Sequence, residues 1–494
     1  TVIIDEVHAY DAYMSKLLEL LLKWLAALGS PVVLLSATLP QKRREMLLKA
    51  YCQGLGYNCV TPQTISSYPR ISWATRNGQE IVCNEEKLTT SESIKETTVK
   101  WVDGAIDPES SKFNLGEQLK SALSEGGCAV VICNTVVRAQ EVYKKLKHYF
   151  SENELLLFHA RFLFTDRDMK EEEVRSKFGK PSEKIESDSE NKQERRKVER
   201  PYRSVLVATQ VVEQSLDIDF DLMVTDIAPV DLVLQRLGRL HRHKRESRPN
   251  KLTKPQLWIT EPKKIVDDTP TFDEGTEVVY DKHILLRSWL ALKEKIEKDS
   301  LLSTPEDIEP LVEAVYSNQS CPQNATEQLK NYWEETYEEL KEELQNMETK
   351  AKEVQIRPPN HEDGILNGTN EDLKEDNPEV HKSLQALTRL SDGPTVSVTI
   401  LTEIESKKYN FNNPPDFEEV EYFLRHSVNL SRRDFVNHLF EITDREKLIP
   451  AGWKLSPFLR HHRLIKVDES GKWRSEKYEL NLDPELGIII SKLD

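Results

Sequence analysis

The pattern of apolar positions over the first forty residues predicts a strand, a helix and a second strand. Residues 2–4 and 32–35 are short continuous apolar runs, and between them apolar side chains recur at helical spacing. The recurring positions are Leu17, Leu21, Trp24 and Leu28, and Gly29 follows them. A glycine directly after the last periodic residue is typical of a helix end. Continuous apolar strands indicate a parallel sheet with both faces covered by helices.

The same alternation of strands and helices returns in the middle of the chain. Residues 129–132, 155–158, 205–208 and 222–225 are apolar runs of strand length, and residues 137–150 have helical spacing. These elements predict a second parallel α/β domain, after a less regular stretch that reaches to about residue 115. Charged side chains of both signs dominate residues 183–200, so we expect an exposed insertion there.

The remainder of the chain predicts a helical connector and a small mixed domain. Helical spacing is found at Leu329, Trp333, Tyr337, Leu340, Leu344 and Met347, before Pro358-Pro359 and a polar stretch through Asn377. Residues 396–401 have strand character, and the region 478–490 has turn signals at Asp483-Pro484 and Gly487. We therefore expect an α+β domain at the end of the chain.

These patterns divide the chain into five segments. Residues 1–60 are expected to end a first α/β domain, and residues 61–115 to join it to a second domain at 116–264. Residues 265–385 form the helical linker, and residues 386–494 form the α+β accessory domain.

Composition narrows the class of protein. The chain has 494 residues, and its 68 basic and 84 acidic side chains give a net charge of −16. That balance excludes a wholly basic nucleic-acid coat but is compatible with a local basic groove. The richest apolar run, residues 17–28, is too short to cross a bilayer, so we expect no membrane span. Six cysteines form no CxxC pair, which favours a reducing cytoplasm, and Cys128 and Cys133 are expected to be inert core thiols.

Two adjacent carboxylates follow the first strand. Asp5 and Glu6, with His8 close behind, stand where an open α/β sheet binds its ligands. In nucleotide hydrolysis an aspartate at this place holds Mg²⁺, and a neighbouring carboxylate can orient the attacking water. Ser36 and Thr38 follow the second strand in the same way, so we expect them at the same edge. The alternative is that these acids and hydroxyls cap the helices that come next.

A basic segment predicts a second chemical feature. Gln235, Arg239 and Arg242 are spaced i, i+4 and i+7, which predicts one helical stripe with two guanidinium groups pointing the same way. Arginines so placed can neutralise charge on a transferred phosphoryl group, with an effect of roughly 10³ to 10⁵ in rate. The basic run continues to Lys254 and suits either contact with a DNA backbone or a solvated face.

Three polar residues precede this segment. Thr209 could donate a hydrogen bond to a nucleic-acid phosphate, a contact that fixes position without reading sequence. Asp217 and Asp219 could hold a ribose or the arginines, or could simply form turns.

Taken together, these segments resemble motifs II, III, V and VI of superfamily 2 helicases, in that order. The segments are residues 5–8, 36–38, 205–221 and 235–243. Their extended forms, with residues 159–162 upstream, resemble the helicase-nuclease of type I CRISPR interference, and residues 453–464 resemble that family's accessory domain. The resemblance implies an α/β fold of RecA-like domains, the first partial and the second complete, with a helical linker and a C-terminal accessory domain.

The resemblance also implies roles around ATP. Asp5 would coordinate Mg²⁺ through water, and Glu6 would activate the hydrolytic water. His8, Ser36 and Thr38 would couple hydrolysis to domain movement.

Further roles are implied for the second domain. Arg239 and Arg242 would be arginine fingers, and Gln235 and Asp219 would help at the nucleotide site between the domains. The residues that would face single-stranded DNA are Asn134, Thr135, Arg161 and Thr209.

The activity implied by the resemblance is ATP-driven translocation along single-stranded DNA in the 3′-to-5′ sense. A guide-RNA surveillance complex would recruit the motor, so sequence specificity would reside in the guide. Two alternatives are open: an RNA helicase of the same superfamily, and a non-catalytic DNA-binding or docking chain.

Two elements of the family are not found in the sequence: a GxxxxGK[ST] phosphate loop and a nuclease domain of His and Asp ligands. Thr1 also opens within an apparent strand, so we expect the chain to be part of a longer polypeptide. Without the loop, the β- and γ-phosphates lack their lysine and backbone cradle. We therefore predict that this chain alone hydrolyses ATP negligibly.

Overall fold

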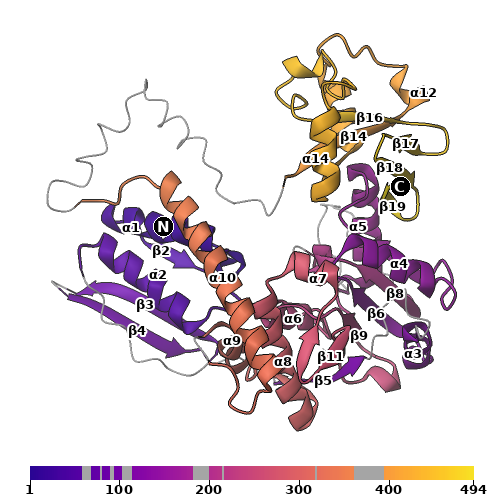
Figure 1. Cartoon of the computed structure of the whole chain (residues 1–494). Coiled ribbons are helices and arrows are strands. Elements are labelled where there is room, and N and C mark those ends of the chain that lie inside the picture. Colours follow the sequence, from indigo (N-terminus) through magenta and orange to yellow (C-terminus); the bar gives the residue numbers. More distant parts are fainter. Residues whose placement is uncertain are drawn as a thin grey trace, which may run out of the picture. The chain divides into compact units, whose positions relative to one another are not determined.

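A computed structural model describes residues 1–57, 68–77, 80–88, 94–102, 114–181, 200–213, 216–317, 320–360 and 394–493 (Figure 1). The chain divides into two compact units. The first unit comprises Thr1–Lys100, Ile227–Gln235 and Pro262–Leu390, and the second comprises Trp101–Asp226, Arg236–Glu261 and Ser391–Asp494. The expected insertion up to residue 199 and the polar stretch from 361 through Asn377 lie outside the described residues.

The first unit begins with the predicted strand, helix and strand. Strands β1 (Val2–Ile4) and β2 (Val32–Leu34) pair in parallel, with Val2 opposite Val32. Between them lie the 3₁₀ turn η1 (Val7–Ala9) and helix α1 (Ala12–Ala27), and helix α2 (Gln41–Gly54) follows β2. Gly29 adopts a left-handed backbone directly after α1, which confirms the predicted helix end.

The buried face of α1 differs from the predicted stripe. Its buried residues are Tyr13, Leu18, Leu22 and Ala26, whereas Leu21 and Leu28 are exposed. Because α1 is apolar on most of its circumference, the spacing rule fits more than one stripe, and packing against α2 decides which one is buried. On the sheet, Ile3 is 65% exposed, so the described residues do not cover both faces as the sequence predicted.

The stretch expected to be irregular contains three strands. Strands β3 (Arg70–Asn77) and β4 (Glu80–Lys87) form an antiparallel hairpin, and β5 (Lys95–Val102) follows them. Their sequences carry many charged residues and no clean apolar alternation, which is why the pattern missed them.

The connector is mostly helical, as predicted, but also contains short strands. Its elements are β11 (Lys264–Val266), β12 (Thr269–Thr271), α7 (Glu274–Val279), α8 (Lys282–Asp299), β13 (Leu301–Thr304), α9 (Ile308–Tyr316) and α10 (Glu327–Val354). Helix α10 packs against α1 and α8 (Figure 1). Its end is fixed on α1, because the amide of Gln355 donates to the carbonyl of Lys16 (2.7 Å) and the indole of Trp24 donates to the carbonyl of Arg357 (3.1 Å).

The second unit contains the predicted parallel sheet, with strand order β10-β9-β6-β8-β7. The strands are β6 (Gly127–Ile132), β7 (Leu155–Phe158), β8 (Arg203–Ala208), β9 (Leu222–Thr225) and β10 (Gln256–Thr260). The helices and 3₁₀ turns around them are α3 (Leu115–Ala122), α4 (Val136–Leu146), α5 (Phe164–Phe178), η2 (Gln210–Val212) and η3 (Asn250–Leu252). Helix α6 (Val230–Leu237) begins in the first unit and ends in the second.

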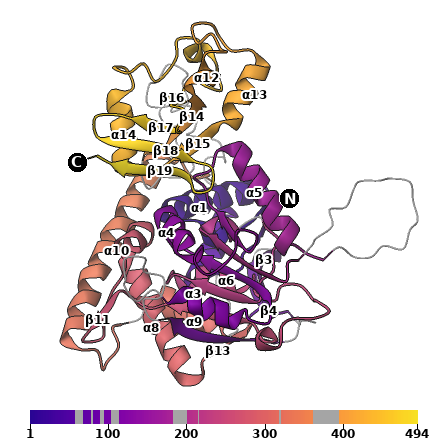
Figure 2. The ribbon, with the colours of Figure 1, turned by 90° about the vertical axis from the view of Figure 1, so that its right-hand side faces the viewer.

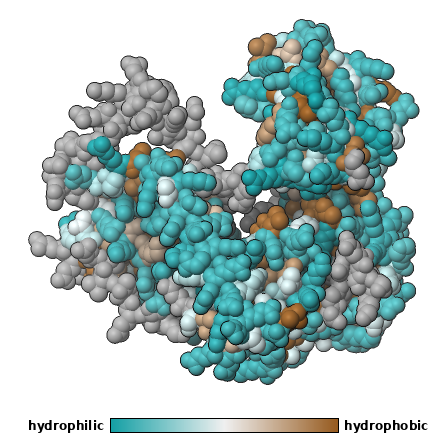
Figure 3. Space-filling model, in the orientation of Figure 1, coloured by the Kyte–Doolittle hydropathy of each residue, from teal (hydrophilic) through white to brown (hydrophobic). Residues whose placement is uncertain are grey.

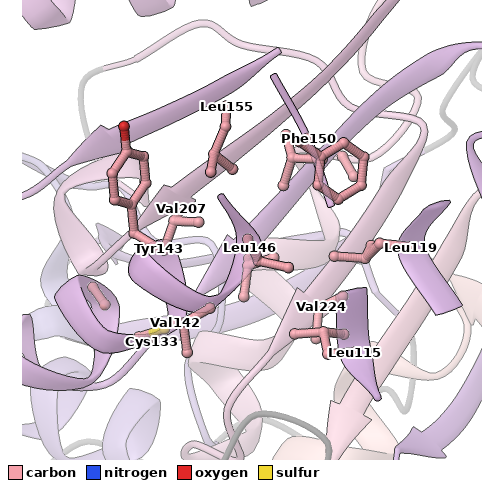
Figure 4. Packing of buried hydrophobic residues seen from close by; sticks show 14 of the residues in the cluster. Leu115, Leu119, Cys133, Val142, Tyr143, Leu146, Phe150, Leu155, Val207 and Val224 are labelled. Carbon is pink, nitrogen blue, oxygen red and sulfur yellow. The ribbon is translucent and has the colours of Figure 1, made fainter. Parts of the chain in front are cut away.

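Helices α3 and α4 bury one face of this sheet. Figure 4 shows Leu119 and Leu146 of the two helices gathered near Val207 and Val224 of the strands. Four of the strands are buried along nearly their whole length. The continuous apolar runs of the sequence therefore correspond to strands covered on both sides, as predicted.

The C-terminal residues form the predicted α+β fold (Figure 2). Its two three-stranded sheets have the orders β15-β14-β16 and β17-β18-β19. The elements are β14 (Val396–Thr402), α12 (Glu403–Ser406), α13 (Phe417–Arg425), β15 (Ser427–Leu430), α14 (Arg433–Ile442), η4 (Trp453–Leu455), β16 (Arg463–Val467), β17 (Lys472–Arg474), β18 (Tyr478–Asp483) and β19 (Gly487–Lys492). Asp483 caps the turn between β18 and β19, and Gly487 has a left-handed backbone, as the turn signals predicted.

This C-terminal hairpin packs against the parallel sheet of the same unit. The amide of Gln140 on α4 donates to the carbonyls of Leu486 (2.8 Å) and Ile488 (3.2 Å). Leu486 also packs into the hydrophobic core of the parallel sheet.

Two further expectations concern membranes and thiols. None of the described helices is long and apolar enough to cross a membrane. Cys128 and Cys133 are buried free thiols, and burial raises the pKa of both, that of Cys128 to about 12. A thiol with so high a pKa is unreactive near neutral pH.

Candidate functional site

The end of β1 presents the two predicted carboxylates to solvent. Asp5 and Glu6 are both exposed, and the Asp5 carboxylate accepts the backbone N–H of Glu6 (2.8 Å). Glu6 has a left-handed backbone with φ 55°, a conformation that costs a non-glycine residue roughly 1–2 kcal/mol. The kink lets the Glu6 carboxylate turn back to His8, where Oε2 lies 3.1 Å from Nε2.

His8 links the ends of the two parallel strands. Its Nδ1 accepts the backbone N–H of Ala37 (3.3 Å), so the neutral ring carries its proton on Nε2, facing Glu6. The Ser36 hydroxyl lies 3.3 Å from the same Nδ1 and 3.0 Å from the carbonyl of Thr38. A hydroxyl has one proton, so Ser36 donates to only one of them at a time. The structure therefore brings these sequence-predicted residues together as one hydrogen-bonded chain.

The helix-capping alternative fails for these residues. Helix α2 has Pro40 at its N-cap position with no side-chain cap, and the N–H of Gln41 instead donates to Glu313 of α9 (2.6 Å). Helix α1 is capped by Asp11, which accepts the N–H of Met14 (2.7 Å). The polar residues at the ends of β1 and β2 are thus not needed to begin either helix.

The predicted helical stripe of Gln235, Arg239 and Arg242 is wrong. Helix α6 ends at Leu237, and His241 has a left-handed backbone with φ 44°. Gly238 interrupts the helix, and the segment then forms a bridge beside Phe220. Arg239 donates to the carbonyl of Glu213 (2.7 Å), while Arg242 follows the turn and is 41% exposed.

Gln235 remains on α6, and its side-chain Nε2 is buried without a hydrogen-bond partner among the described residues. A buried amide donor without a partner is costly and suits a polar ligand.

Asp219 is the centre of a buried arginine cluster. Its carboxylate has no exposed surface, accepts the backbone N–H of Arg242 (2.7 Å), and pairs with Arg200 (3.5 Å), Arg248 (3.1 Å) and Arg245. Burial acts to raise the pKa of Asp219, but the guanidinium groups outweigh it and hold the pKa below its usual value. Of the predicted partners of Asp219, the arginines are therefore the ones present. The expected direct contact with a nucleotide does not fit this buried carboxylate.

The basic run up to Lys254 is partly internal. Asp221, also buried, pairs with Arg248 and accepts the N–H of Cys128 (2.7 Å). Lys251 donates to the hydroxyl of Ser124 after α3 (2.8 Å). The run is thus not one continuous solvated face, because Arg245 and Arg248 neutralise buried aspartates. That its exposed lysines contact DNA stays a prediction.

Sequence reasoning missed the role of Arg236. This side chain is fully buried and donates to Glu213 (2.7 Å), to the hydroxyl of Thr225 (2.6 Å) and to the carbonyl of Asp226 (3.2 Å). Spacing alone did not separate it from Arg239. The available signal was one acid, Glu213, close after strand β8, because the carboxylate of Asp226 pairs with Arg138 and only its backbone carbonyl contacts Arg236.

The predicted DNA-facing residues converge on one edge of the parallel sheet. Strands β6, β8 and β7 are neighbours with their carboxyl ends level, since Ala208 is opposite both Ile132 and Phe158. The residues that follow these ends are Asn134, Thr135, Thr209 and Arg161. The amide of Gln210 joins two of the strand ends by donating to the carbonyl of Asn134 (2.8 Å).

These side chains differ in how much they are exposed. Asn134 and Thr209 are buried, while Thr135 is half-buried and caps α4 by accepting the N–H of Arg138 (3.3 Å). Arg161 is half-buried, and burial together with the charge of Arg432 lowers its pKa to about 10. Its backbone carbonyl accepts the N–H of Ile488 from the C-terminal hairpin (2.8 Å).

His159, in front of Arg161, is part of the same junction. It is fully buried, stacks on Phe162 with ring centroids 4.4 Å apart, and its Nε2 lies 3.1 Å from the carbonyl of Leu486. The N–H of Arg161 donates to Nδ1 (3.1 Å), so the neutral ring donates from Nε2 to Leu486. Burial lowers the pKa of His159 to about 3.

Each unit thus carries one part of the candidate site. The first unit joins Asp5, Glu6, His8 and Ser36, and the second carries Arg239 and Arg242. That both parts meet one triphosphate stays a prediction. Within the described residues, no group of three or more His, Cys, Asp or Glu side chains could hold a metal ion on its own.

Two parts of the chain match known families. Residues 125–245 match the family described as CRISPR-associated nuclease/helicase Cas3, C-terminal, and residues 386–488 match the Cas3 C-terminal domain. The CRISPR-associated nuclease/helicase Cas3 of Streptococcus thermophilus is 30% identical over 516 residues, which covers 100% of this chain and 51% of the relative. The chain therefore spans about half the length of the curated relatives it matches.

Solved structures give the same result. A crystal structure of a CRISPR-associated protein aligns with a TM-score of 0.82 at 40% identity and covers all of this chain and 51% of that one. The T. fusca Cas3-AMPPNP structure aligns with a TM-score of 0.79 at 28% identity (99% of this chain, 54% of that chain). A chain of a CRISPR RNA-guided surveillance complex, pre-nicking, aligns with a TM-score of 0.74 at 28% identity (99% and 56%). These likenesses confirm the expected α/β class with RecA-like domains.

Proposed function

Because the chain belongs to the Cas3 family of CRISPR-associated nuclease/helicases, we propose that it forms the C-terminal half of an ATP-driven motor that moves along single-stranded DNA. The observation that carries this proposal is the hydrogen-bonded chain from Glu6 through His8 to Ser36 and Thr38. It joins the Glu6 carboxylate at one strand end to the loop after the neighbouring strand. Such a link lets a change at a bound nucleotide alter the backbone that leads into α2.

ATP and Mg²⁺ are the proposed cofactors. Structures of the T. fusca relative are described as complexes with AMPPNP, ADP and ATP. In this chain, the exposed carboxylate oxygens of Asp5 and Glu6 are the hard ligands that Mg²⁺ prefers. The buried Nε2 of Gln235 is a hydrogen-bond donor that could bind an oxygen of the nucleotide. The donor set therefore fits a magnesium nucleotide. Mg²⁺ supplies neutralisation of phosphate charge, and Asp5 would hold it through water.

The side chains around this site would divide the work of hydrolysis. Glu6 would accept the proton of the attacking water, and His8, which donates to Glu6, would keep that carboxylate oriented. Arg242 would neutralise charge that develops on the phosphates. Its present partner Asp217 is 53% exposed, and an exposed ion pair of this kind is worth about 0–1 kcal/mol, so Arg242 can leave it at little cost.

The carboxyl edge of β6, β8 and β7 would grip the DNA backbone. Thr135 and Arg161 offer a hydroxyl and a guanidinium group at that edge, and neither type of contact reads base sequence. Base specificity would then reside in the guide RNA of a surveillance complex, the kind of assembly that contains one of the similar structures.

The test uses a full-length Cas3 that carries this sequence as its C-terminal half. We expect magnesium-dependent ATP hydrolysis that single-stranded DNA stimulates, and Glu6→Gln should reduce it at least about 100-fold, because a positioned general base contributes roughly 10² to 10⁴ in rate. Glu86→Gln, on the exposed face of β4, is the matched control. Stimulation by single-stranded RNA alone would favour the RNA helicase alternative, and equal loss in both variants would remove Glu6 from the mechanism.

A further inference from the structure

The C-terminal domain contains a hollow that the site described above does not use. It has a volume of about 800 Å³ and lies between the loop before α13, the turn after α14 and strands β16 and β17. The side chains that matter for its chemistry are Phe411, Lys447, Lys454, Lys466 and Trp473. The rest of this domain's surface is mostly hydrophilic on the face seen in Figure 3.

Three lysines give the hollow its charge. Lys447, Lys454 and Lys466 are exposed, and none of them forms an ion pair with a described residue. Two acids also line the hollow, but Glu446 lies 3.6 Å from Arg445, and Asp444 acts electrostatically on Arg463. Both acids thus act on arginines that do not line the hollow, and lysines outnumber acids among the lining residues. In a chain with a net charge of −16, a local excess of lysines that have no ion-pair partner among the described residues favours an anionic ligand.

The backbone places one of these lysines at a cost. Lys447 adopts a left-handed conformation with φ 52°, in the turn where the N–H of Leu448 donates to the carbonyl of Thr443 (2.9 Å). A left-handed residue other than glycine costs roughly 1–2 kcal/mol. Leu448 is in turn tied to β16, because the N–H of Leu464 donates to its carbonyl (2.7 Å). The turn is therefore held firmly, with the Lys447 side chain at the hollow.

Aromatic rings supply the other half of the chemistry. The Lys466 ammonium lies 5.1 Å from the centroid of the Phe411 ring, which is half-buried. Trp473 on β17 is also half-buried, and its ring is supported edge-on by buried Phe435, with centroids 6.3 Å apart. Cations beside partly exposed rings are the combination that binds single-stranded nucleic acid, with phosphates on the cations and bases on the rings.

We propose that this hollow binds single-stranded DNA as a second contact, separate from the sheet edge of the same unit. Lys447 and Lys466 hold phosphates, and Trp473 stacks on a base. This proposal rests on the proposed function, because single-stranded DNA is the ligand in both. An acidic peptide of a partner protein would suit the lysines equally but has no base to stack on Trp473, which is why the DNA strand is favoured.

The test measures binding of a fluorescent oligo-dT to the 494-residue chain by anisotropy, as a function of salt. Each phosphate contact on a single strand contributes about 0.7 to the slope of log affinity against log salt, so Lys447→Gln/Lys466→Gln should lower the slope by about 1.4. Lys120→Gln/Lys492→Gln removes the same charge from exposed positions outside the hollow and should leave the slope unchanged. Trp473→Leu should weaken binding at least about fivefold.

Each outcome decides the matter. An equal slope for the two double variants overturns the proposal. The proposal is also overturned if Lys447→Gln/Lys466→Gln abolishes binding of a polyglutamate peptide while Trp473→Leu leaves DNA binding intact, because the ligand is then an acidic peptide. Thermal melting of each variant excludes unfolding as the cause. If Arg161→Gln weakens DNA binding and the hollow variants do not, only the second contact fails. If the hollow variants weaken it and Arg161→Gln does not, the sheet-edge assignment fails. A wild-type chain that binds no DNA refutes both.

Discussion

Replacing the buried carboxylate of Asp219 by an amide is expected to destabilise the second unit strongly. In Asp219→Asn the buried guanidinium group of Arg245 loses its carboxylate partner, and that of Arg248 keeps only Asp221. Breaking a buried ion pair by removing one partner costs about 3–5 kcal/mol. Whole domains are stable by only about 5–15 kcal/mol, so this single change should remove a large part of the stability.

The matched control lies two residues away. Asp217 pairs with Arg242 at 2.6 Å but is exposed, so Asp217→Asn should cost about 0–1 kcal/mol. Urea denaturation of both variants, followed by far-UV circular dichroism, measures the difference as a shift of the midpoint at unchanged slope. A free energy of unfolding for Asp219→Asn within about 1 kcal/mol of that of Asp217→Asn would refute the reasoning, because the cost expected for breaking a buried ion pair would then not apply.

The same variant has a pH signature. The pKa of Asp219 is lower in the folded chain than in the unfolded one, so the charged carboxylate contributes stability above the unfolded pKa of about 3.9. That contribution is lost as the pH falls through the lower, folded pKa. The stability gap between wild type and Asp219→Asn should therefore be full near neutral pH and close in acid.

Three further predictions follow from the site. In the full-length protein, Arg242→Ala should abolish ATP turnover while ATP binding measured by calorimetry stays within a few-fold, because the finger acts chiefly on the transition state; unchanged turnover would exclude Arg242 from catalysis. The pKa of His159 falls from the unfolded value of about 6.5 to about 3, so protonation favours unfolding. Stability should be constant above pH 6.5 and decline between about 6.5 and 3, and a His159→Gln variant should show a flatter profile in that window; an identical profile would contradict the assignment. The 494-residue chain alone should show no ATP hydrolysis above the rate of its Glu6→Gln variant in a phosphate-release assay, and strong magnesium-dependent turnover would disprove the need for a phosphate loop.

The strands of the parallel sheet and the end of α1 at Gly29 could be predicted because they depend on local pattern. Residues 205–208 and 222–225 are continuous apolar runs, and each is a buried strand. Strands β3 and β4 could not be predicted in the same way, since a charged two-stranded hairpin has no hydrophobic alternation. The choice of buried face on α1 depends on tertiary contacts with α2, which the sequence pattern does not contain.

The candidate site shows the same division. Asp5, Glu6 and His8 were identified from their position after a strand, and their geometry is a matter of a few neighbouring residues. The fate of the arginines was decided by partners far along the chain. Arg236 and Arg239 are three residues apart, yet Arg236 is fully buried against the Glu213 carboxylate and Arg239 is not. Helical spacing was misleading for residues beyond Gly238, because α6 ends at Leu237.

The seating of the C-terminal hairpin has a consequence for how this protein can be dissected. Leu486 is a member of the hydrophobic core of the parallel sheet, and Leu163, just before α5, is in turn a member of the core of the C-terminal domain. Each of the two regions that match a known family thus contributes a side chain to the hydrophobic core of the other region. If the chain were cut in the linker between them, the piece with the parallel sheet would expose the core around His159, and the C-terminal piece would expose the apolar side of its hairpin. We therefore expect that neither piece folds stably alone.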